Sequence, residues 1–447
     1  MVPLIRRFFG SAPLLNNLPR TPRNLLIVRN PSSGGGRGEK VFDRQLARLL
    51  QLGGWRVHAV DPNMPVIKSR EGDEIHVKDF LRKHPMHNIL TTTTLGGDPG
   101  RRIAALTRLI DAIQSVSETG RLVVDCIGGD GTQIEVKTAC TESLGIFLDQ
   151  VVNHQLGRTK YQALLETAPL ILPSRGGTAC DIPTALGFEA KDDIVKALRE
   201  AKAIRMPTGI AKVTTSNKDE IFLDVSHSMS AGAGAVLFAE AERNKYGFWK
   251  GTVAPYFLAI PKVVMDKAGA WVEGILESID LFENPRDLDP FYVHYQINQG
   301  PLQCVQASDF LMSGLRYIGG ALYSPATPID GLVVYILPAN TMGTLGIAFE
   351  AGLRGAGKKA VGDRGTSILL GNRLLTMDAS RQISLKPGDT LLARFTIDRD
   401  GILPRSVPWQ ANGEPQPTQV SEITVTVGQP YPYLATPKSR EAVRRLT

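Results

Sequence analysis

The sequence predicts a two-domain chain of mixed class, with an α/β domain followed by an all-β domain. Over about the first 205 of its 447 residues, short apolar runs alternate with segments of helical periodicity, as in a parallel sheet covered by helices. After about Met206, short β-type runs are separated by Gly, Pro, Asn and Asp, which favours an antiparallel sandwich or barrel. We therefore expect a basic extension over 1–23, a three-layer α/β domain over 24–205, an antiparallel β-sandwich over 206–435 and a basic tail over 436–447.

The strands and helices of the first domain are predicted from apolar runs and from their spacing. Leu122–Ile127 is the strongest strand, because a continuous apolar run is expected where both faces of a sheet are covered. A helix is expected where Phe42, Leu46, Leu49 and Leu50 recur at helical intervals. Residues 62–90 are polar and irregular and are predicted to be an insertion. The other expected strands are Leu25–Val28, Trp55–Val60 and Leu170–Leu172, and the other helices are Arg101–Val116 and Lys191–Ile204.

The second domain is predicted from strands alone, apart from one helical interruption over about Ala235–Lys267. Turn-forming residues bound each run, so neighbouring strands are expected to pair antiparallel. The expected strands are Ile221–Val225, Tyr292–Ile297, Leu332–Leu337, Gln382–Leu385, Thr390–Ile397 and Glu422–Val427.

The formal net charge of +7 is concentrated at the two ends of the chain. Six arginines precede Glu39, the first acidic residue, and residues 436–447 carry a net +3, so residues 39–435 carry −2. A nucleic-acid-binding domain needs a basic face on the folded body, and this composition gives no sign of one. The N-terminus is open to three interpretations: an organelle-targeting segment, a basic amphipathic piece at a membrane surface, or a solvated terminus.

The four cysteines and the hydropathy pattern place further limits on the class of protein. No CxxC pair occurs among Cys126, Cys140, Cys180 and Cys304, so neither a zinc site nor a disulfide framework is indicated. No apolar run approaches the roughly 18 residues that would cross a bilayer. We expect a cytoplasmic protein in a reducing compartment.

Three Gly-rich loops follow predicted strands of the first domain. They are Asn30–Gly38, Gly128–Thr132 and Pro173–Asp181. Each alone is either a simple βα turn or a phosphate cradle, in which glycine lets the ligand approach the backbone N–H groups. Because the carboxyl ends of parallel strands meet at one edge of a sheet, the three loops are expected to converge there on a ligand.

These loops resemble the motifs of the diacylglycerol kinase catalytic-domain superfamily, which includes sphingosine, ceramide and bacterial lipid kinases. The chain has NPSSG at Asn30–Gly34, GGDGTQIEV at Gly128–Val136 and GGTACD at Gly176–Asp181. Asp330-Gly331 and Asn412-Gly413-Glu414 resemble two later motifs of the family, in the same order. The resemblance implies an α/β nucleotide-binding domain and a β-sandwich domain with the active site in the cleft between them. It also implies transfer of the γ-phosphoryl group of ATP, with Mg²⁺, to a lipid hydroxyl at a membrane surface.

The resemblance also implies roles for individual residues. Glu414 is assigned as the general base and Asp130 as the ligand of Mg-ATP, although within the family these roles also occur the other way round. Asp330 corresponds to a further metal ligand. The residues implied in nucleotide binding are Asn30, Pro31, Ser32, Ser33, Gly34, either Thr93 or Thr94, Gly128, Gly129, Asp130, Gly131, Thr132, Gly177 and Thr178.

Several positions depart from the family pattern and keep alternatives open. Cys180 and Asn412 replace an Asn and an Asp, and Thr327 replaces a metal-binding Asp. A nucleotide-binding regulator that has lost catalysis is therefore one alternative. An NAD kinase-like enzyme with a soluble substrate is another, because GGDGT also occurs in NAD kinases. His227 and His154 are further candidates for catalysis, but a single His is more often a surface or hydrogen-bonded structural residue.

Overall fold

The computed structural model describes most of the chain and divides it into two compact units. The described residues are 24–68, 72–116, 122–146, 158–177, 180–188, 194–236, 239, 290–315, 317–318, 322–323, 331–339, 381–412 and 414–436. Unit 1 comprises residues up to Arg205 together with Pro432–Thr447, and unit 2 comprises Met206–Tyr431. Residues 432–435 thus group with the first unit, whereas the sequence analysis assigned them to the second domain.

Unit 1 is built on a parallel sheet. β1 (Asn24–Arg29) lies between β5 (Asn88–Thr93) and β6 (Val123–Gly128), and β2 (Arg56–Asp61) and β7 (Leu170–Arg175) pair outside them, all in parallel. The short strands β3 (Val66–Lys68) and β4 (Glu74–His76) continue the β2 edge antiparallel. On the opposite edge, the end of β20 (Val420–Ala435) pairs with β7 through Tyr433 and Ile171.

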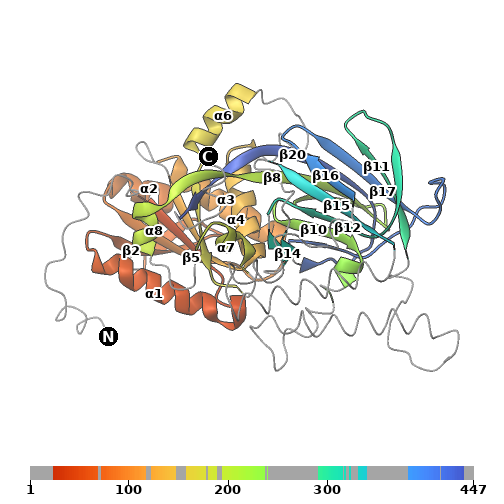
Figure 1. Cartoon of the computed structure of the whole chain (residues 1–447). Helices are drawn as coiled ribbons and strands as arrows, with labels where there is room; N and C mark the ends of the chain where they lie inside the picture. Colours follow the sequence, from red (N-terminus) through yellow and green to blue (C-terminus); the bar gives the residue numbers. More distant parts are fainter. Residues whose placement is uncertain are drawn as a thin grey trace, which may run out of the picture. The chain divides into compact units, whose positions relative to one another are not determined.

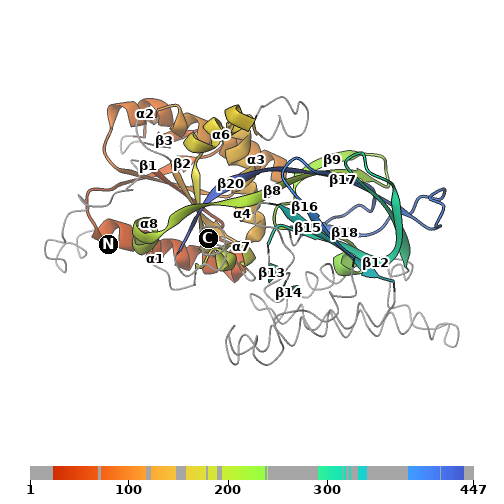
Figure 2. The same cartoon turned by 45° about the horizontal axis from the view of Figure 1, so that its top comes forward.

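Helices cover both faces of this sheet, so the predicted three-layer arrangement is confirmed (Figures 1 and 2). α1 (Arg37–Gln51) packs with α8 (Ile194–Glu200), and α3 (Pro99–Gln114) packs with α4 (Asp130–Ser143) and α2 (Val77–Lys83). The remaining described helices are η3 (Ser33–Gly35), α6 (Arg158–Thr167) and α7 (Asp181–Ala185). The central strands are buried on both faces, as their continuous apolar runs predicted.

Two local predictions for unit 1 were wrong. Residues 62–90 are not an irregular insertion, because they contain β3, β4 and α2 and lead into the buried central strand β5. The helix expected over Lys191–Ile204 ends at Glu200, and β8 (Lys202–Thr215) begins two residues later. Alanine and isoleucine in this stretch fit either structure, and strand pairing decided between them.

Unit 2 consists of antiparallel strands around one apolar core. β12 (Gln303–Ser313) pairs with β15 (Leu332–Pro338), and also with β11 (Phe291–Ile297) and β10 (Ser228–Gly232) along successive parts of its length. β11 also pairs with β17 (Thr390–Thr396), which pairs in turn with β20, and β15 pairs with β16 (Arg381–Leu385). β9 (Glu220–Asp224) pairs with β8, and β18 (Trp409–Ala411) joins β10 to β19 (Glu414–Pro415). A two-stranded pair, β13 (Tyr317–Ile318) and β14 (Leu322–Tyr323), completes the described strands.

The core of unit 2 is large and dominated by aromatic and β-branched side chains. Trp409, Phe310 and Phe395 are each about 1% exposed or less, and the rings of Phe310 and Phe395 meet edge to face at 5.9 Å. Burial of one such side chain stabilises a fold by about 1.5–3 kcal/mol. The predicted class, an α/β domain plus an antiparallel all-β domain, is therefore confirmed. The expected helical segment around Ala235–Lys267 lies almost entirely outside the described residues.

Candidate active site

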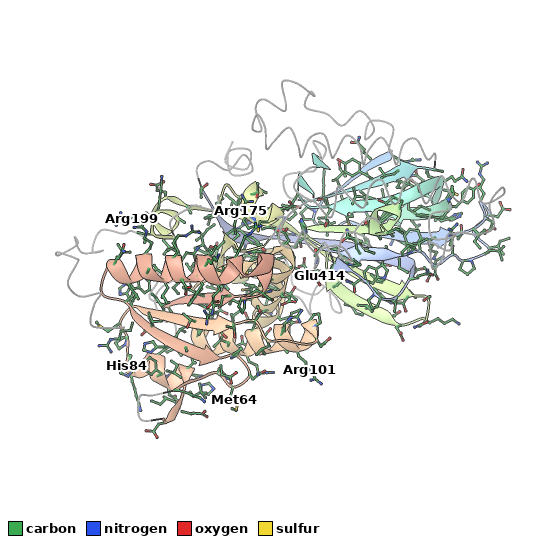
Figure 3. The ribbon with its side chains drawn as sticks, turned by 90° about the horizontal axis from the view of Figure 1, so that it is seen from below. Met64, His84, Arg101, Arg175, Arg199 and Glu414 are labelled. Atoms are coloured by element: carbon green, nitrogen blue, oxygen red, sulfur yellow. The ribbon has the colours of Figure 1, made fainter. Side chains whose placement is uncertain are left out.

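The predicted Gly-rich loops converge at the carboxyl edge of the unit 1 sheet. β1, β5, β6 and β7 are parallel, so the loops that follow them all leave from this edge (Figure 3, where Arg175 marks the end of β7). Backbone hydrogen bonds join neighbouring loops: the N–H of Asn30 donates to Ile127 at 2.9 Å, and that of Gly176 donates to Gly128 at 3.1 Å. Thr94 N–H likewise donates to Arg29 at 2.8 Å. The expected convergence is therefore present within one rigid framework of backbone contacts.

Glycine is required in these loops because they pack against one another. Gly34 has φ +58°, and a Cβ atom there would lie 2.6 Å from the carbonyl oxygen of Gly176. A Cβ on Gly177 would overlap the Cα atom of Gly129. Gly129 is different, because its own Cβ would meet nothing closer than 3.6 Å. The glycines thus do more than admit a ligand, since Gly34 and Gly177 are needed for the loops to meet at all.

Side chains of the first two loops are also hydrogen-bonded to each other. Asn30 Nδ2 donates to Thr132 Oγ1 at 3.1 Å, and Ser32 Oγ donates to Asn30 Oδ1 at 2.8 Å. Thr132 is buried, whereas Pro31 and Ser32 are exposed at the rim. The NPSSG and GGDGT motifs therefore form one connected surface, with the N-terminus of α4 opening onto it. Helix N-termini present N–H groups and a partial positive charge, which favour a phosphate.

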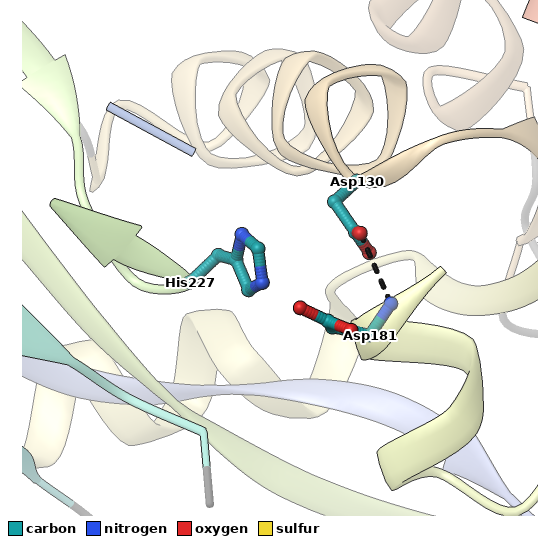
Figure 4. Close-up of side chains that lie close together, drawn as sticks. All are labelled: Asp130, Asp181 and His227. Atoms are coloured by element: carbon teal, nitrogen blue, oxygen red, sulfur yellow. Dashed lines mark hydrogen bonds between the residues drawn. The ribbon is translucent and has the colours of Figure 1, made fainter. Parts of the chain in front are cut away.

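Asp130 joins the second loop to the third. Its Oδ2 accepts a hydrogen bond from the N–H of Asp181 at 3.0 Å (Figure 4). Its Oδ1 accepts one from the N–H of Ile182, also at 3.0 Å. The Asp130 side chain therefore sits at the N-terminus of α7 while its own residue begins α4. A proton on either carboxylate oxygen would break one of these amide bonds, so the arrangement favours Asp130 as a carboxylate ligand rather than as a proton acceptor.

The two buried carboxyl groups, Asp130 and Asp181, could hold a divalent cation. Their oxygens lie within 4.8 Å of one another. Mg²⁺ prefers oxygen ligands and is commonly held by one or two carboxylates together with phosphates, so this donor set fits Mg²⁺. The sequence analysis named Asp130 for this role but not Asp181, although Asp181 closes the GGTACD motif. Asp330, Thr327 and Thr178 lie outside the described residues.

Cys180 bridges the same two loops. It adopts a left-handed conformation (φ 54°), accepts the N–H of Gly177 at its Sγ atom at 3.2 Å, and directs its thiol toward the carbonyl oxygen of Gly128 at 3.9 Å. Burial, with the negative charge of Asp130, raises the pKa of Cys180 to about 12. A thiol with this pKa is neutral at physiological pH, which does not favour Cys180 as a nucleophile.

Asn412 and Glu414 of the NGE motif lie where β18 ends and β19 begins in unit 2. Asn412 has φ 54°, which Asn tolerates better than most residues, and its Nδ2 donates to the carbonyl oxygen of Asp224 at 2.7 Å. Its N–H donates to Ser228 at 2.7 Å. Glu414, the predicted base, begins β19 and is exposed to solvent (Figure 3). His227 is buried and lies 3.4 Å from Ser228 Oγ through its Nδ1 atom; His154 lies outside the described residues.

The sequence analysis missed two polar groups that support the loops. Glu135, within GGDGTQIEV, accepts two hydrogen bonds from Arg102 Nε at 3.0 and 3.1 Å, and Arg102 also donates to the carbonyl of Gly97. This pair fixes the loop after β5, which begins at Thr94, against α4. The second group surrounds Asp125 in β6. An acidic residue inside an apolar strand run was the available signal for it.

Comparisons with known proteins return solved structures that align over most of the chain. One, of diacylglycerol kinases from Bacillus anthracis str. Sterne, has 12% identity and a TM-score of 0.45, and covers 93% of this chain and 97% of that chain. Yeast NADH kinase complexed with NADH has 12% identity and a TM-score of 0.41, with 98% and 91% covered. An NAD kinase from Archaeoglobus fulgidus in complex with ATP has 9% identity and a TM-score of 0.37, with 94% and 97% covered.

No family model and no curated protein matches the chain. Likeness at these identities and TM-scores does not decide an activity, so the function has to be inferred from the site itself. In the described part of the chain, no helix is both long enough and apolar enough to cross a bilayer.

Proposed function

We propose that the chain is an ATP- and Mg²⁺-dependent kinase that transfers the γ-phosphoryl group to a lipid hydroxyl. The observation that supports this most is the packing of the NPSSG, GGDGT and GGTACD loops into one surface at the N-termini of α4 and α7. Phosphoryl transfer depends mainly on positioning and on neutralising phosphate charge. A set of closely packed loops at the N-terminus of α4, with two carboxylates nearby, is suited to both tasks.

The residues divide the chemistry as follows. The loops bind the triphosphate through backbone N–H groups, and Asp130 and Asp181 hold the cation. Mg²⁺, when bound, neutralises phosphate charge and orients the γ-phosphoryl group. The oxygen of the lipid hydroxyl bonds to the γ-phosphorus as ADP departs, and Glu414 takes the proton of that hydroxyl. This division follows the family resemblance for Glu414 and is supported for Asp130 by its two amide hydrogen bonds.

Two alternatives are distinguished by one assay. Purified protein is incubated with labelled ATP, Mg²⁺ and either NAD or a panel of diacylglycerol, sphingoid base, ceramide and phosphatidylglycerol in mixed micelles. Label in a lipid supports the proposal, and label in NAD alone replaces it with an NAD kinase-like activity. ATP binding without transfer to any acceptor would indicate a regulator, although Cys180 and Asn412, which raised that alternative, both make fitting local hydrogen bonds.

Glu414→Gln tests the assigned base. Because Glu414 is exposed, the variant should fold normally and bind ATP with unchanged affinity. Loss of general-base catalysis should lower kcat by about 10²–10⁴-fold. Glu220→Gln is the matched control, an exposed glutamate on β9 of the same unit, and should leave kcat unchanged. Equal activity of the two variants would remove Glu414 from the mechanism.

We further propose that the protein works in the cytoplasm as a peripheral membrane protein, since its acceptor is insoluble in water. The charge distribution supports this, because the basic ends flank a body of net charge −2. No nucleic-acid partner is proposed.

A further inference from the structure

A carboxyl group that the proposed chemistry does not use is buried beneath the loops. Asp125 lies in the middle of β6, is 0% exposed, and precedes Gly128 of the GGDGT motif by three residues. The flanking residues of the strand, Val123, Val124 and Cys126, are buried and apolar. A carboxyl group costs free energy in such an environment, so its presence calls for an explanation beyond packing.

Asp125 is one end of a hydrogen-bonded chain across three elements. Ser174 Oγ on β7 donates to Asp125 Oδ1 at 2.6 Å, and Gln45 Nε2 on α1 donates to Ser174 Oγ at 2.8 Å. Among the described residues, Asp125 Oδ2 is buried without a hydrogen-bond partner. α1 follows the NPSSG loop, β6 leads into the GGDGT loop and β7 leads into the third loop. The chain of hydrogen bonds therefore ties together the supports of all three.

The surroundings of Asp125 allow both its ionised and its protonated form to be populated at neutral pH. Burial raises the pKa of Asp125 to about 7, against the opposing effect of the Ser174 hydrogen bond. β6 also contributes Cys126, whose pKa is raised well above its usual value by burial and by the charges of Asp125 and Glu135.

The elements packed against β6 bring few other charges. Arg175 follows Ser174 on β7, and Arg29 at the end of β1 is paired with Glu39. α4 carries four charged residues: Glu135 is paired with Arg102, Asp130 and Lys137 are buried, and Glu142 is near the end of the helix. The charged side chains of α1 around Gln45, namely Asp43, Arg44 and Arg48, are exposed.

We propose that Asp125 is a positioning residue that couples nucleotide binding to proton uptake, with the carboxylate taking up one proton from solvent when a triphosphate occupies the loops. This inference rests on the proposed function only in requiring that ATP binds there. Gly128 follows Asp125 by three positions of the strand, or about 10 Å, and the two residues between them, Cys126 and Ile127, are fully buried. A bound triphosphate places negative charge above the carboxylate and so favours its neutral form.

The pairing of β6 with β7 strengthens this coupling. The two strands are paired along their length up to Gly128 and Arg175, and the N–H of Gly176 donates to the Gly128 carbonyl oxygen at 3.1 Å, so their ends cannot move apart to relieve the repulsion without breaking backbone hydrogen bonds. Protonation of Asp125 is then the response left to the site. A proton on Asp125 Oδ2 leaves the hydrogen bond from Ser174 to Oδ1 in place, so the loops keep their positions.

Isothermal titration calorimetry with Mg-ATP at pH 7.5, in two buffers of different ionisation enthalpy, measures the protons taken up on binding. If the triphosphate raises the pKa by one unit, about half a proton should be taken up per nucleotide. Asp125→Asn should abolish this uptake. Glu142→Gln is the matched control and should behave as wild type. Glu142 is a half-buried carboxyl group of unit 1 whose pKa is raised, and it accepts a hydrogen bond from the Thr107 hydroxyl. Taking the difference between proteins cancels protonation of the nucleotide itself.

Ser174→Ala provides a second variant that keeps the carboxyl group. Removing the hydroxyl that lowers the pKa of Asp125 should move the window of proton uptake to higher pH. ATP binding with equal proton uptake in wild type and Asp125→Asn would overturn the inference and leave the proposed function standing. If Asp125→Asn fails to fold, an uptake profile unchanged by Ser174→Ala would overturn it instead. Absence of ATP binding in the wild type would overturn the proposed function and this inference together.

Discussion

At the scale of single residues, two departures from the family pattern are explained by backbone geometry. Cys180 holds a left-handed conformation with φ 54°, which costs roughly 1–2 kcal/mol for most L-residues and less for Asn. Its Sγ atom accepts the N–H of Gly177, a bond that an Asn side-chain oxygen could also make. The cysteine thus performs the bridging task at some cost in backbone strain.

Cys180→Asn should therefore stabilise unit 1. We expect the free energy of unfolding to rise by about 0.5–1 kcal/mol, because Asn tolerates the left-handed region better. Urea unfolding followed by tryptophan fluorescence and circular dichroism measures the change. Cys180→Val, a β-branched residue, should lower stability. A Cys180→Asn protein less stable than wild type would contradict the strain argument.

Asn412 makes use of a donor that aspartate lacks. Its Nδ2 donates to the carbonyl oxygen of Asp224 at 2.7 Å. A carboxylate at this position would set two hydrogen-bond acceptors against each other with no donor between them. Asn412→Asp should lower the free energy of unfolding by about 1–3 kcal/mol, although it restores the family motif. Thermal unfolding at pH 7 and pH 4 provides the check, since protonation of the new carboxyl restores a donor. A loss of stability that is the same at both pH values would contradict this explanation.

At the scale of elements, the three loops form one packed unit through their glycines. Gly177→Ala places a methyl group against the Cα atom of Gly129 and should cost about 1–3 kcal/mol through overpacking. ATP affinity should fall as well, because the second and third loops must separate. Gly96→Ala is the control, since its Cβ would meet nothing within 4 Å. Equal melting temperatures for the two variants would show that the loops have more freedom than the structure gives them.

The sequence predicted elements where apolar residues are continuous and failed where small or polar residues are buried. β1 was found from Leu, Ile and Val alone and β6 from a mainly apolar run that includes Asp125, whereas β5 (NILTTT) was missed because its threonines count as polar although Thr91 and Thr92 are buried. β10 (SMSAG) was missed for the same reason, since all five of its residues are buried although most are small. In both strands it is pairing with neighbours, rather than local composition, that fixes the structure.

The candidate site shows the same limit. The position of the three loops after parallel strands predicted that they would converge, and they do. The motifs could not reveal that Asp130 caps α7 or that Ser174 links Gln45 to Asp125, because these bonds join residues from 49 to 129 positions apart. In α1, Leu50 was one of the four apolar residues whose spacing predicted the helix, but it is 49% exposed, whereas the polar Gln45 is buried.

At the scale of the whole molecule, the net positive charge lies at the two ends of the chain and not in the body between them. Residues 39–435 carry −2, and the positive charge is concentrated before Glu39 and after Ala435. A near-neutral body gives little attraction to an anionic lipid surface, whereas each basic residue near such a surface contributes about 1 kcal/mol. The ends are therefore the part of the chain whose charge should decide membrane binding.

Neutralising the N-terminal arginines tests this directly, without changing the length of the chain. The four substituted to Gln are Arg6, Arg7, Arg20 and Arg23. Binding to vesicles of phosphatidylcholine with 30 mol% or so of phosphatidylserine should weaken more than tenfold at low salt, and the difference should shrink as salt screens the charges. A control variant substitutes four exposed basic residues of the body to Gln, namely Arg56, Arg101, Arg199 and Lys386. It removes the same charge, so an equal loss of vesicle binding in both variants would mean that net charge alone, and not its position at the end of the chain, governs the attraction.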